Sequence, residues 1–373
     1  MIALLICLAW LFLLLFWGGF WRADQRLGAA ATRQNWPDIS ILIPARNEAE
    51  TISDAVHAHM ATSYPGKVTL IVTDDHSTDG TGEIAKSAGA NVVTAKDLPN
   101  GWSGKLWALQ SALQHADQIT PDAAYILLTD ADILHDPNTL SKLVAKAEAE
   151  GLDLVSLMAR LDARSFWGAL LIPAFIFFFQ KLYPFAWVNR PGSPVAAAAG
   201  GCVLVRRKAL HRIGDFPALH DALIDDCTLA ARIKQSGGKL WLGLADDEVL
   251  SLRDNRSFAS IWAMVRRTAF TQLRHSWVLL GLSVLGMLFL YIGPVLALTY
   301  GLLTLSPEPT MFGALACVLM SVAYWPTLQL YRQSRWKVMT LPLAAAFYTA
   351  MTVASAVAHM RGAGGAWKGR TYA

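Results

Sequence analysis

The chain has 373 residues, of which 54% are hydrophobic and only 16% are charged, and its mean hydropathy is +0.35. Soluble domains carry about 25% charged residues, so this composition excludes a disordered chain, a collagen-like chain and an ordinary soluble enzyme. The net charge is +4 and no run of Lys and Arg is interleaved with aromatic residues, so nucleic acid is not expected as a partner. The four cysteines lack C-x-x-C spacing, which argues against a zinc site or a disulfide framework.

The first apolar segment lies at the amino terminus. Residues 2–21 carry no charge, and about 20 such residues are enough to cross the ~30 Å hydrocarbon core of a bilayer. We therefore expect a transmembrane helix over 1–22. A cleaved signal peptide is the alternative, but the segment lacks a basic start and exceeds the usual apolar length of such peptides.

Three further apolar segments predict three transmembrane segments over 277–360, followed by a tail over 361–373; they lie at about 277–303, 311–328 and 339–360. The loop 304–310 has no Lys or Arg, whereas 329–337 has three. The positive-inside rule then places the central domain in the cytoplasm and the amino terminus outside. This topology exports the tail, yet the tail is basic; keeping it inside would require a re-entrant or interfacial last segment, and both arrangements stay open.

The region 36–276 has the composition of a soluble domain, and apolar strands alternate with helical patterns along it. We expect strands at 39–44, 68–73, 91–94, 125–129 and 152–157, and helices at about 47–60, 81–88, 106–115 and 137–150. This alternation predicts an α/β fold with a mostly parallel sheet and helices on both faces. Ligands of such sheets bind beyond the carboxyl ends of the strands.

A further apolar patch lies inside this domain, at 166–188. It is interrupted by Pro173, Gln180, Lys181 and Pro184. If it crossed the membrane, motifs that need each other would face different compartments. We therefore interpret it as an amphipathic helix or helix pair in the membrane interface. A buried core helix is the alternative.

Three acidic clusters stand out in the domain. Asp74 and Asp75 follow the second strand, and Asp130 and Asp132 follow the fourth; Asp225 and Asp226 open a later helix. Turn formation and helix capping account for single carboxylates at such places, and a lone D-x-D is a weak signal. Alternate carboxylates past a buried strand repel each other unless a cation lies between them, which favours a hard-metal site.

Lys105 follows two glycines, in Gly101-Trp-Ser-Gly104. The glycine spacing is wrong for a P-loop, and Leu106 stands where that motif requires Ser or Thr. A lysine at the start of a helix can nevertheless meet a phosphate as a point charge.

In their order along the chain these motifs resemble those of family 2 glycosyltransferases, over about residues 38–275. The resemblance rests on Ile41-Leu-Ile-Pro-Ala-Arg-Asn-Glu48, the run from Asp74 to Thr81, Gly104-Lys105, Thr129-Asp-Ala-Asp132, Gly200-Gly201 with Arg206-Arg207, and Asp225-Asp226. The membrane segments and the ending Trp367-Lys-Gly-Arg-Thr-Tyr372 look like the hopanoid-biosynthesis-associated branch of that family.

The resemblance implies an inverting enzyme of the nucleotide-diphospho-sugar transferase fold, multi-pass in a bacterial-type inner membrane with its catalytic domain in the cytoplasm. The donor would be a nucleotide-sugar, with UDP as the expected nucleotide, and the acceptor a lipid in the bilayer. The implied donor-binding residues are Pro44, Arg46, Glu48, Asp75, Lys105, Asp130, Gly200 and Gly201. Asp130 and Asp132 would hold Mg²⁺ or Mn²⁺. Asp226 would be the general base, with Asp225 beside it.

The departures from the family pattern bear on the acceptor. The pair Asp225-Asp226 stands where many members have Glu-Asp. Processive members carry Gln-x-x-Arg-Trp after the domain, whereas Gln272-Leu-Arg-His-Ser-Trp277 has a different spacing, which counts against a polymer synthase. Arg266, Arg267 and Arg274 could contact the donor pyrophosphate, or form a basic collar at the membrane surface.

Other functions stay open at this point: a polyprenyl-phosphate sugar transferase, a processive polysaccharide synthase, and a catalytically silent membrane scaffold or transport subunit. The preferred function requires the three acidic clusters to converge on one site. Carboxyl groups of Asp132 and Asp226 that opened onto separate cavities would contradict it. The oligomeric state is not predicted.

Overall fold

A seven-stranded sheet lies at the centre of the computed structural model, which describes all residues except 29–32, 221, 223, 363–365, 368–369 and 372–373. The strand order is β3-β2-β1-β4-β7-β6-β8, and only β7 runs antiparallel to its neighbours. The strands are β1 Ile39–Ala45, β2 Val68–Asp74, β3 Asn91–Thr94, β4 Tyr125–Leu128, β6 Leu154–Met158, β7 Val203–Arg206 and β8 Leu240–Leu244. The expected mostly parallel α/β sheet is confirmed.

Helices cover both faces of this sheet because its central strands are apolar on both sides. In β1, Ile41 and Ile43 belong to one core cluster and Leu42 to the other. The first face packs against α2 (Ile52–Met60) and α5 (Thr139–Glu150), and the second against α4 (Gly104–Ile119) and α9 (Asp225–Gln235). The smaller elements of the domain are α3 Thr81–Ser87, β5 Ile133–His135, α8 Arg207–Arg212, η2 Phe216–Leu219 and β9 Val249–Ser251.

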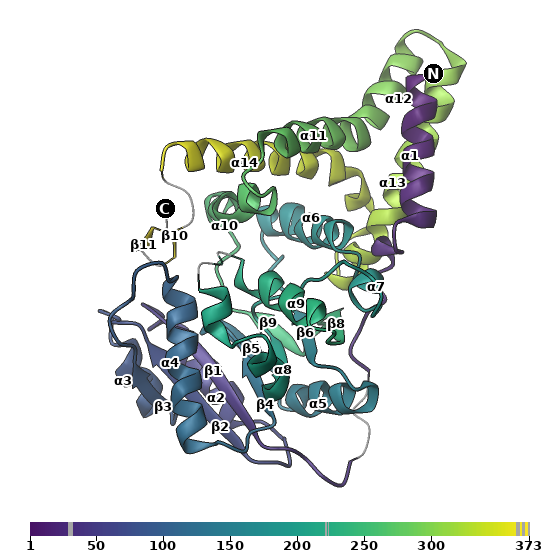
Figure 1. Ribbon diagram of the computed structural model, residues 1–373. Coiled ribbons are helices and arrows are strands. Elements are labelled where there is room, and N and C mark those ends of the chain that lie inside the picture. The colour runs from purple at the N-terminus through teal and green to yellow at the C-terminus, as the bar shows by residue number, and fades with distance from the viewer. Residues whose placement is uncertain (29–32, 221, 223, 363–365, 368–369, 372–373) are drawn as a thin grey trace.

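The apolar segments outside the sheet form helices that lie over one end of the domain (Figure 1). They are α1 Ile2–Phe16, α11 Trp277–Met287, α12 Gly293–Leu303, α13 Pro307–Leu330 and α14 Leu341–Met360, with short turns η1 Phe20–Arg22 and η4 Arg335–Thr340. A π-helical turn, η3 (Leu288–Ile292), joins α11 to α12. Among the described residues, four stretches are long and apolar enough to cross a membrane: Phe166–Val188, Trp277–Leu303, Pro307–Leu330 and Arg335–Met360. Helix α1 is apolar but shorter, with 15 residues.

These helices form two groups that point in different directions. Helices α1, α12 and α13 pack side by side and extend away from the domain (Figure 1). At their far end the amino group of Met1 forms an ion pair with Glu308, in the first turn of α13. Helix α14 instead runs beside α10 (Phe258–Gln272), on the outer side of the sheet domain.

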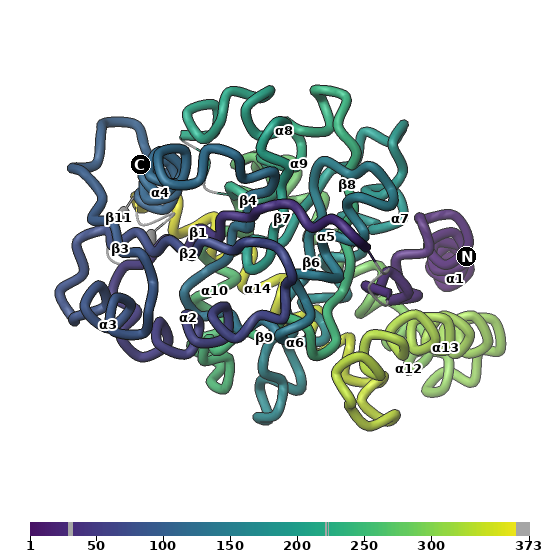
Figure 2. Tube along the Cα trace, turned by 90° about the horizontal axis from the view of Figure 1, so that it is seen from below, coloured from purple at the N-terminus to yellow at the C-terminus, as the bar shows by residue number. Residues whose placement is uncertain are grey.

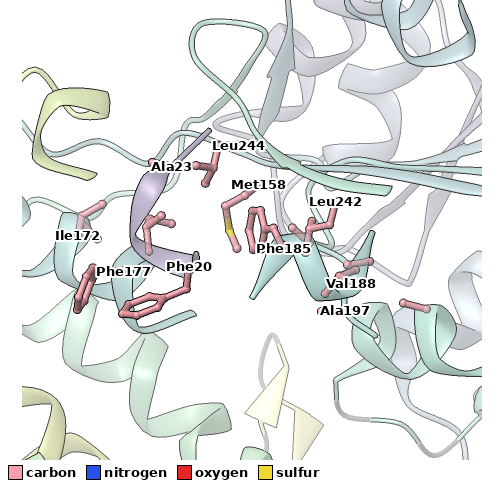
Figure 3. Packing of buried hydrophobic residues seen from close by; sticks show 14 of the residues in the cluster. Phe20, Ala23, Met158, Ile172, Phe177, Phe185, Val188, Ala197, Leu242 and Leu244 are labelled. Carbon is pink, nitrogen blue, oxygen red and sulfur yellow. The ribbon is translucent and has the colours of Figure 1, made fainter. Parts of the chain in front are cut away.

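The patch 166–188 forms α6 (Phe166–Leu182) and α7 (Phe185–Val188), which are largely buried between the domain and the apolar helices. The rings of Phe177 and Phe20 lie 5.3 Å apart, and Phe185 lies near Met158 of β6 and Leu242 of β8 (Figure 3). A core helix therefore describes most of α6. Only its ends are open, with Phe166 75% and Leu182 53% exposed.

The tail forms two short strands, β10 (Ala366–Trp367) and β11 (Arg370–Thr371), which lie beside α4 in both Figure 1 and Figure 2. Of the tail motif that carried part of the family resemblance, Lys368, Gly369 and Tyr372 lie outside the described residues.

Candidate active site

The carboxyl ends of β1, β2 and β4 meet at one edge of the sheet, where the parallel strands of an α/β fold bind their ligands. A cavity of about 1150 Å³ opens there. Its polar residues come from the loops after β1 and β4, from the start of α4, from the first turn of α9, from the segment after β9 and from α10. The lining residues include Pro44, Glu48, Lys105, Asp130, Asp132, Asp225, Arg253, Phe258, Ala259, Trp262, Ala263, Met264, Arg266 and Arg267.

The loops after β1 and β2 are held together by hydrogen bonds. The side-chain oxygen of Asn47 accepts from Thr78 N (2.9 Å), and Glu48 N donates to Thr81 Oγ1 (2.8 Å). Asn47 has a positive φ of 52°, a conformation that asparagine tolerates better than most residues. The sequence predicted a helix from about residue 47, but these hydrogen bonds hold residues 47 and 48 in the loop, and α2 begins at Ile52.

The two adjacent carboxylates after β2 have different surroundings. Asp74 Oδ1 accepts from Ser77 N (3.0 Å), so this residue shapes the turn. Asp75 is fully buried, and its carboxylate lies 3.6 Å from Arg46, which also donates to the Asp75 carbonyl. Neither Arg46 nor Asp75 is among the residues that line the large cavity.

Lys105 links two of the acidic clusters. Its Nζ lies 3.0 Å from Asp130 Oδ1 and 3.2 Å from Asp225 Oδ2. Burial of Lys105 disfavours its positive charge, but the charges of Asp130, Asp225 and Asp226 outweigh this and raise the pKa of Lys105. The lysine is therefore a permanent cation at the centre of the acidic residues.

Asp226 lies behind this lysine, in the first turn of α9. Its Oδ2 accepts from Gly200 N at 2.7 Å, and its Oδ1 accepts from Cys227 N at 2.7 Å. Burial, followed by the charge of Asp225, raises the pKa of Asp226 to about 6. A Cβ on residue 200 would lie 3.4 Å from both Asp226 Oδ2 and Lys105 Nζ, so glycine lets the backbone come close to the carboxylate. A carboxyl group with this pKa can take up a proton near neutral pH.

The D-x-D carboxylates line the large cavity opposite two arginines. Asp132 Oδ2 lies 3.1 Å from Arg253 Nε. Burial and the like charge of Arg253 lower the pKa of Arg267, which indicates that the two guanidinium groups repel each other. Two arginines close together in a cleft favour an anion between them, such as a diphosphate.

The three acidic clusters do not converge on one cavity as the sequence led us to expect. Asp132 lines the large cavity, Asp226 lines a smaller one beside it, and Asp74 and Asp75 line neither. The two cavities share Pro44, Lys105, Asp130 and Asp225. Lys105 and its two ion-pair partners, Asp130 and Asp225, therefore lie on the wall that separates the cavity of Asp132 from the cavity of Asp226.

A divalent cation would be held by Asp130 and Asp132. The described residues contain no group of three or more His, Cys, Asp and Glu that could hold a metal ion. Mg²⁺ is commonly bound by one or two carboxylates together with substrate phosphates. Two cavity-lining carboxylates opposite cationic residues fit that pattern.

Some sequence-predicted residues lie away from the cavities. Gly201 faces the core, since a Cβ there would lie 3.1 Å from Ile133 Cδ1, and Thr129 Oγ1 donates to its carbonyl. Arg274 lies past the end of α10 and is not among the lining residues, unlike Arg266 and Arg267. Arg253 and the aromatic wall of α10 were not predicted. Arg253 follows the end of the three-residue strand β9. Ligand-binding residues of α/β folds follow strand ends, and we call this the strand-end rule. The rule would have found Arg253 if β9 had been predicted from the sequence.

A mostly parallel sheet with acidic clusters and a lysine at its carboxyl edge defines a fold of the nucleotide-sugar transferase type. Residues 40–214 match the model of glycosyl transferase family 2. The match covers slightly less than half of the chain and agrees with the family resemblance of the sequence motifs.

Similar proteins agree with this match. The chain is 37% identical over 110 residues to 4,4'-diaponeurosporenoate glycosyltransferase of Staphylococcus aureus (strain USA300), covering 29% of this chain and 28% of that protein. It is 35% identical over 120 residues to glycosyltransferase AglJ of Haloferax volcanii, covering 32% and 35%. The match thus spans about a third or less of these curated relatives.

One solved structure resembles nearly the whole chain. It is mannosyltransferase PcManGT from Pyrobaculum calidifontis, in complex with GDP-Man and Mn²⁺. The TM-score is 0.58 at 19% identity, over 96% of this chain and 99% of the other. At this identity the likeness concerns the fold alone.

Proposed function

We propose that this chain is an inverting glycosyltransferase that moves a sugar from a nucleotide-diphospho-sugar to a lipid acceptor at the membrane surface. The observation that carries the proposal is the position of Lys105 between Asp130 and Asp225, with Asp226 lining the same small cavity as Lys105. This arrangement offers positive charge for a leaving diphosphate next to a carboxylate that can accept a proton.

Each residue has a place in such a reaction. Cleavage of the sugar–diphosphate bond builds negative charge on the leaving phosphate, and Lys105, Arg253 and Arg267 supply positive charge to stabilise it. A divalent cation bound to Asp130 and Asp132 would add Lewis-acid stabilisation of that diphosphate. Asp226 would take the proton of the acceptor hydroxyl as its oxygen attacks the anomeric carbon, and attack from the face opposite the leaving group inverts the configuration. Asp225 would keep Lys105 in place.

The donor and acceptor are proposed from the relatives and from the family resemblance. The resemblance favours a UDP-sugar, whereas the solved relative holds GDP-Man, so both nucleotides belong in the test. The Staphylococcus relatives are named as glycosyltransferases of 4,4'-diaponeurosporenoate, which by its name carries a carboxylate. Together with four apolar stretches of membrane-spanning length, this favours a lipid acceptor, with a hopanoid as the specific proposal.

The test uses membranes that contain the full chain. They are incubated with radiolabelled UDP- and GDP-sugars plus Mn²⁺ or Mg²⁺, and the lipids are then extracted. Label in the organic phase that depends on the chain is expected, and its mobility before and after mild acid distinguishes a lipid glycoside from an acid-labile polyprenyl-phosphate sugar. Polymer retained in the aqueous phase would favour a processive synthase. Absence of transfer from every donor would overturn the proposal.

A further inference from the structure

The first part of α10 gives the large cavity a mainly apolar lining. Phe258, Trp262 and Met264 line it together with the exposed small residues Ala259 and Ala263, whereas Ser260, Arg266 and Arg267 are the polar lining residues of this helix. The carboxylates and Lys105 line other parts of the same cavity. A cavity that combines charged groups with a run of apolar residues suits a ligand with a polar end and an apolar body.

Aromatic rings continue from this wall to the outer surface. The Phe258 ring lies 5.4 Å from Trp262 on one side and 4.7 Å from Trp167 on the other. Trp167 contacts Phe166 at 5.2 Å, and Phe166 is 75% exposed. Phe347 of α14 packs against both Trp167 and Phe258, at 5.7 and 5.3 Å. We name these five residues the aromatic path.

The outer end of the aromatic path lies among helices suited to a bilayer. Two of the helices that form the path, α6 and α14, belong to stretches of membrane-spanning length and apolarity. On the chain segment that leads to Phe347, Leu343 of α14 is 52% exposed and Met339 of η4 is 80% exposed. The hydrocarbon of a bilayer is therefore the expected environment of this surface.

Positive charge accompanies the apolar residues at the outer end. The exposed side chains of Arg164 and Arg256 both pair with Asp162, at 2.9 and 3.5 Å, which leaves one positive charge in excess. Ser165, directly before Phe166, donates to the Arg256 carbonyl. Exposed basic residues beside an apolar surface suit the phosphate headgroups of a membrane.

We propose that the aromatic path binds the hydrocarbon body of a bilayer lipid, so that its polar end reaches the cavity at Lys105, Asp130 and Asp225. The identification of this lipid as the acceptor rests on the proposed function, but binding of its apolar body requires no sugar transfer. Trp262 and Ala263 then limit which apolar bodies fit against α10.

The test is photo-crosslinking in phosphatidylcholine vesicles that contain the full chain. The probe is hexadecanol with a diazirine near its chain end, and labelled peptides are mapped by mass spectrometry. We expect the peptide with residues 258–264 to be labelled above the level of α1, whose apolar residues are also exposed. Ala263→Phe should fill the space at the wall and lower this labelling about tenfold, while Ala350→Phe, at an exposed alanine of α14 that does not line the cavity, should leave it unchanged.

Should Ala263→Phe fail to fold, Trp262→Leu tests the same wall by removing a ring. Labelling of 258–264 no stronger than that of α1, or equal loss in the Ala263 and Ala350 variants, would overturn the inference. Sugar transfer without labelling of α10 would overturn it and leave the proposed function standing. Labelling of α10 without sugar transfer by the wild-type chain would overturn the proposed function and leave this inference standing.

Discussion

The fold brings the pKa of Asp226 close to neutral pH. Burial and the neighbouring Asp225 raise its pKa to about 6, and a general base works only when deprotonated. Below pH 6 the carboxyl group holds a proton and cannot accept another, so kcat should fall as the pH is lowered through about 6. The measurement is kcat for sugar transfer between pH 5 and 8 at saturating donor and acceptor.

Replacement of this carboxylate separates two acceptor classes. Asp226→Asn should lower kcat by about 10²–10⁴-fold if the acceptor is a hydroxyl, because the amide cannot take its proton. Asp117→Asn, which removes a surface partner of Arg207, is the matched control and should keep near-normal activity. Near-normal turnover by Asp226→Asn would indicate instead an acceptor that is already ionised, such as a polyprenyl phosphate.

Lys105 is expected to act on the donor. Lys105→Gln removes the cation between Asp130 and Asp225 and leaves their carboxylates facing each other. We expect kcat/KM for the nucleotide-sugar to fall about 10²–10³-fold, since charge stabilisation of the leaving diphosphate is lost. Lys142→Gln, which breaks a partly exposed pair with Glu248, serves as control; a similar loss in both variants would contradict a specific role for Lys105.

The site was predictable where the strand-end rule applies. Asp130 and Asp132 follow a strand that its apolar run reveals, so their place at the sheet edge follows from the sequence. The burial of Asp75 and the pairing of Asp132 with Arg253 depend on side-chain packing between distant segments. No local pattern encodes such contacts, and Arg253 lies more than a hundred residues from Asp132.

At the scale of elements, α6 and α10 are joined next to Asp226. The Tyr183 hydroxyl donates to Gln272 Oε1 at 2.7 Å and also hydrogen-bonds with Cys227, the residue after Asp226. Tyr183→Phe and Gln272→Ala should each lower the stability of the folded chain, with a coupling energy of about 0.5–1.5 kcal/mol between them. A double-mutant cycle of unfolding in detergent measures it, and a coupling energy of zero would mean that the pair does not hold the two helices together.

The elements themselves were predictable to different degrees. Strands β1 to β4 are short apolar runs bounded by turn residues, and their predicted bounds differ from the structure by no more than a residue or two at each end. Strand β7 was missed because its four residues, Val203–Arg206, follow a glycine pair that gave the stronger signal. Its antiparallel insertion between β4 and β6 is a property of the whole sheet, since β6 precedes β7 in the chain.

At the scale of the whole molecule, α14 packs along α10 of the domain instead of extending away from it as α1, α12 and α13 do. Phe347 contacts Phe258 at the start of α10, Ser355 Oγ accepts from Phe270 N near its end, and the His359 ring stacks on His275 at 4.1 Å. These contacts run in the same order along both helices. Helix α14 therefore lies parallel to the outer wall of the cavity, and both its ends stay near the domain.

This course of α14 favours one of the two arrangements that the sequence left open for the tail. If α1, α12 and α13 cross the bilayer and α14 lies in its interface, Arg361 at the end of α14 stays on the side of the domain, as the positive-inside rule requires. We expect an epitope tag after residue 373 to be protected from protease in intact bacterial spheroplasts, together with a tag inserted at Gly237 in the domain. A tag ahead of Met1 should be digested, because Met1 lies at the far end of the α1–α12–α13 bundle. Digestion of the tag after residue 373 in intact spheroplasts would mean that α14 crosses the membrane as a fourth span.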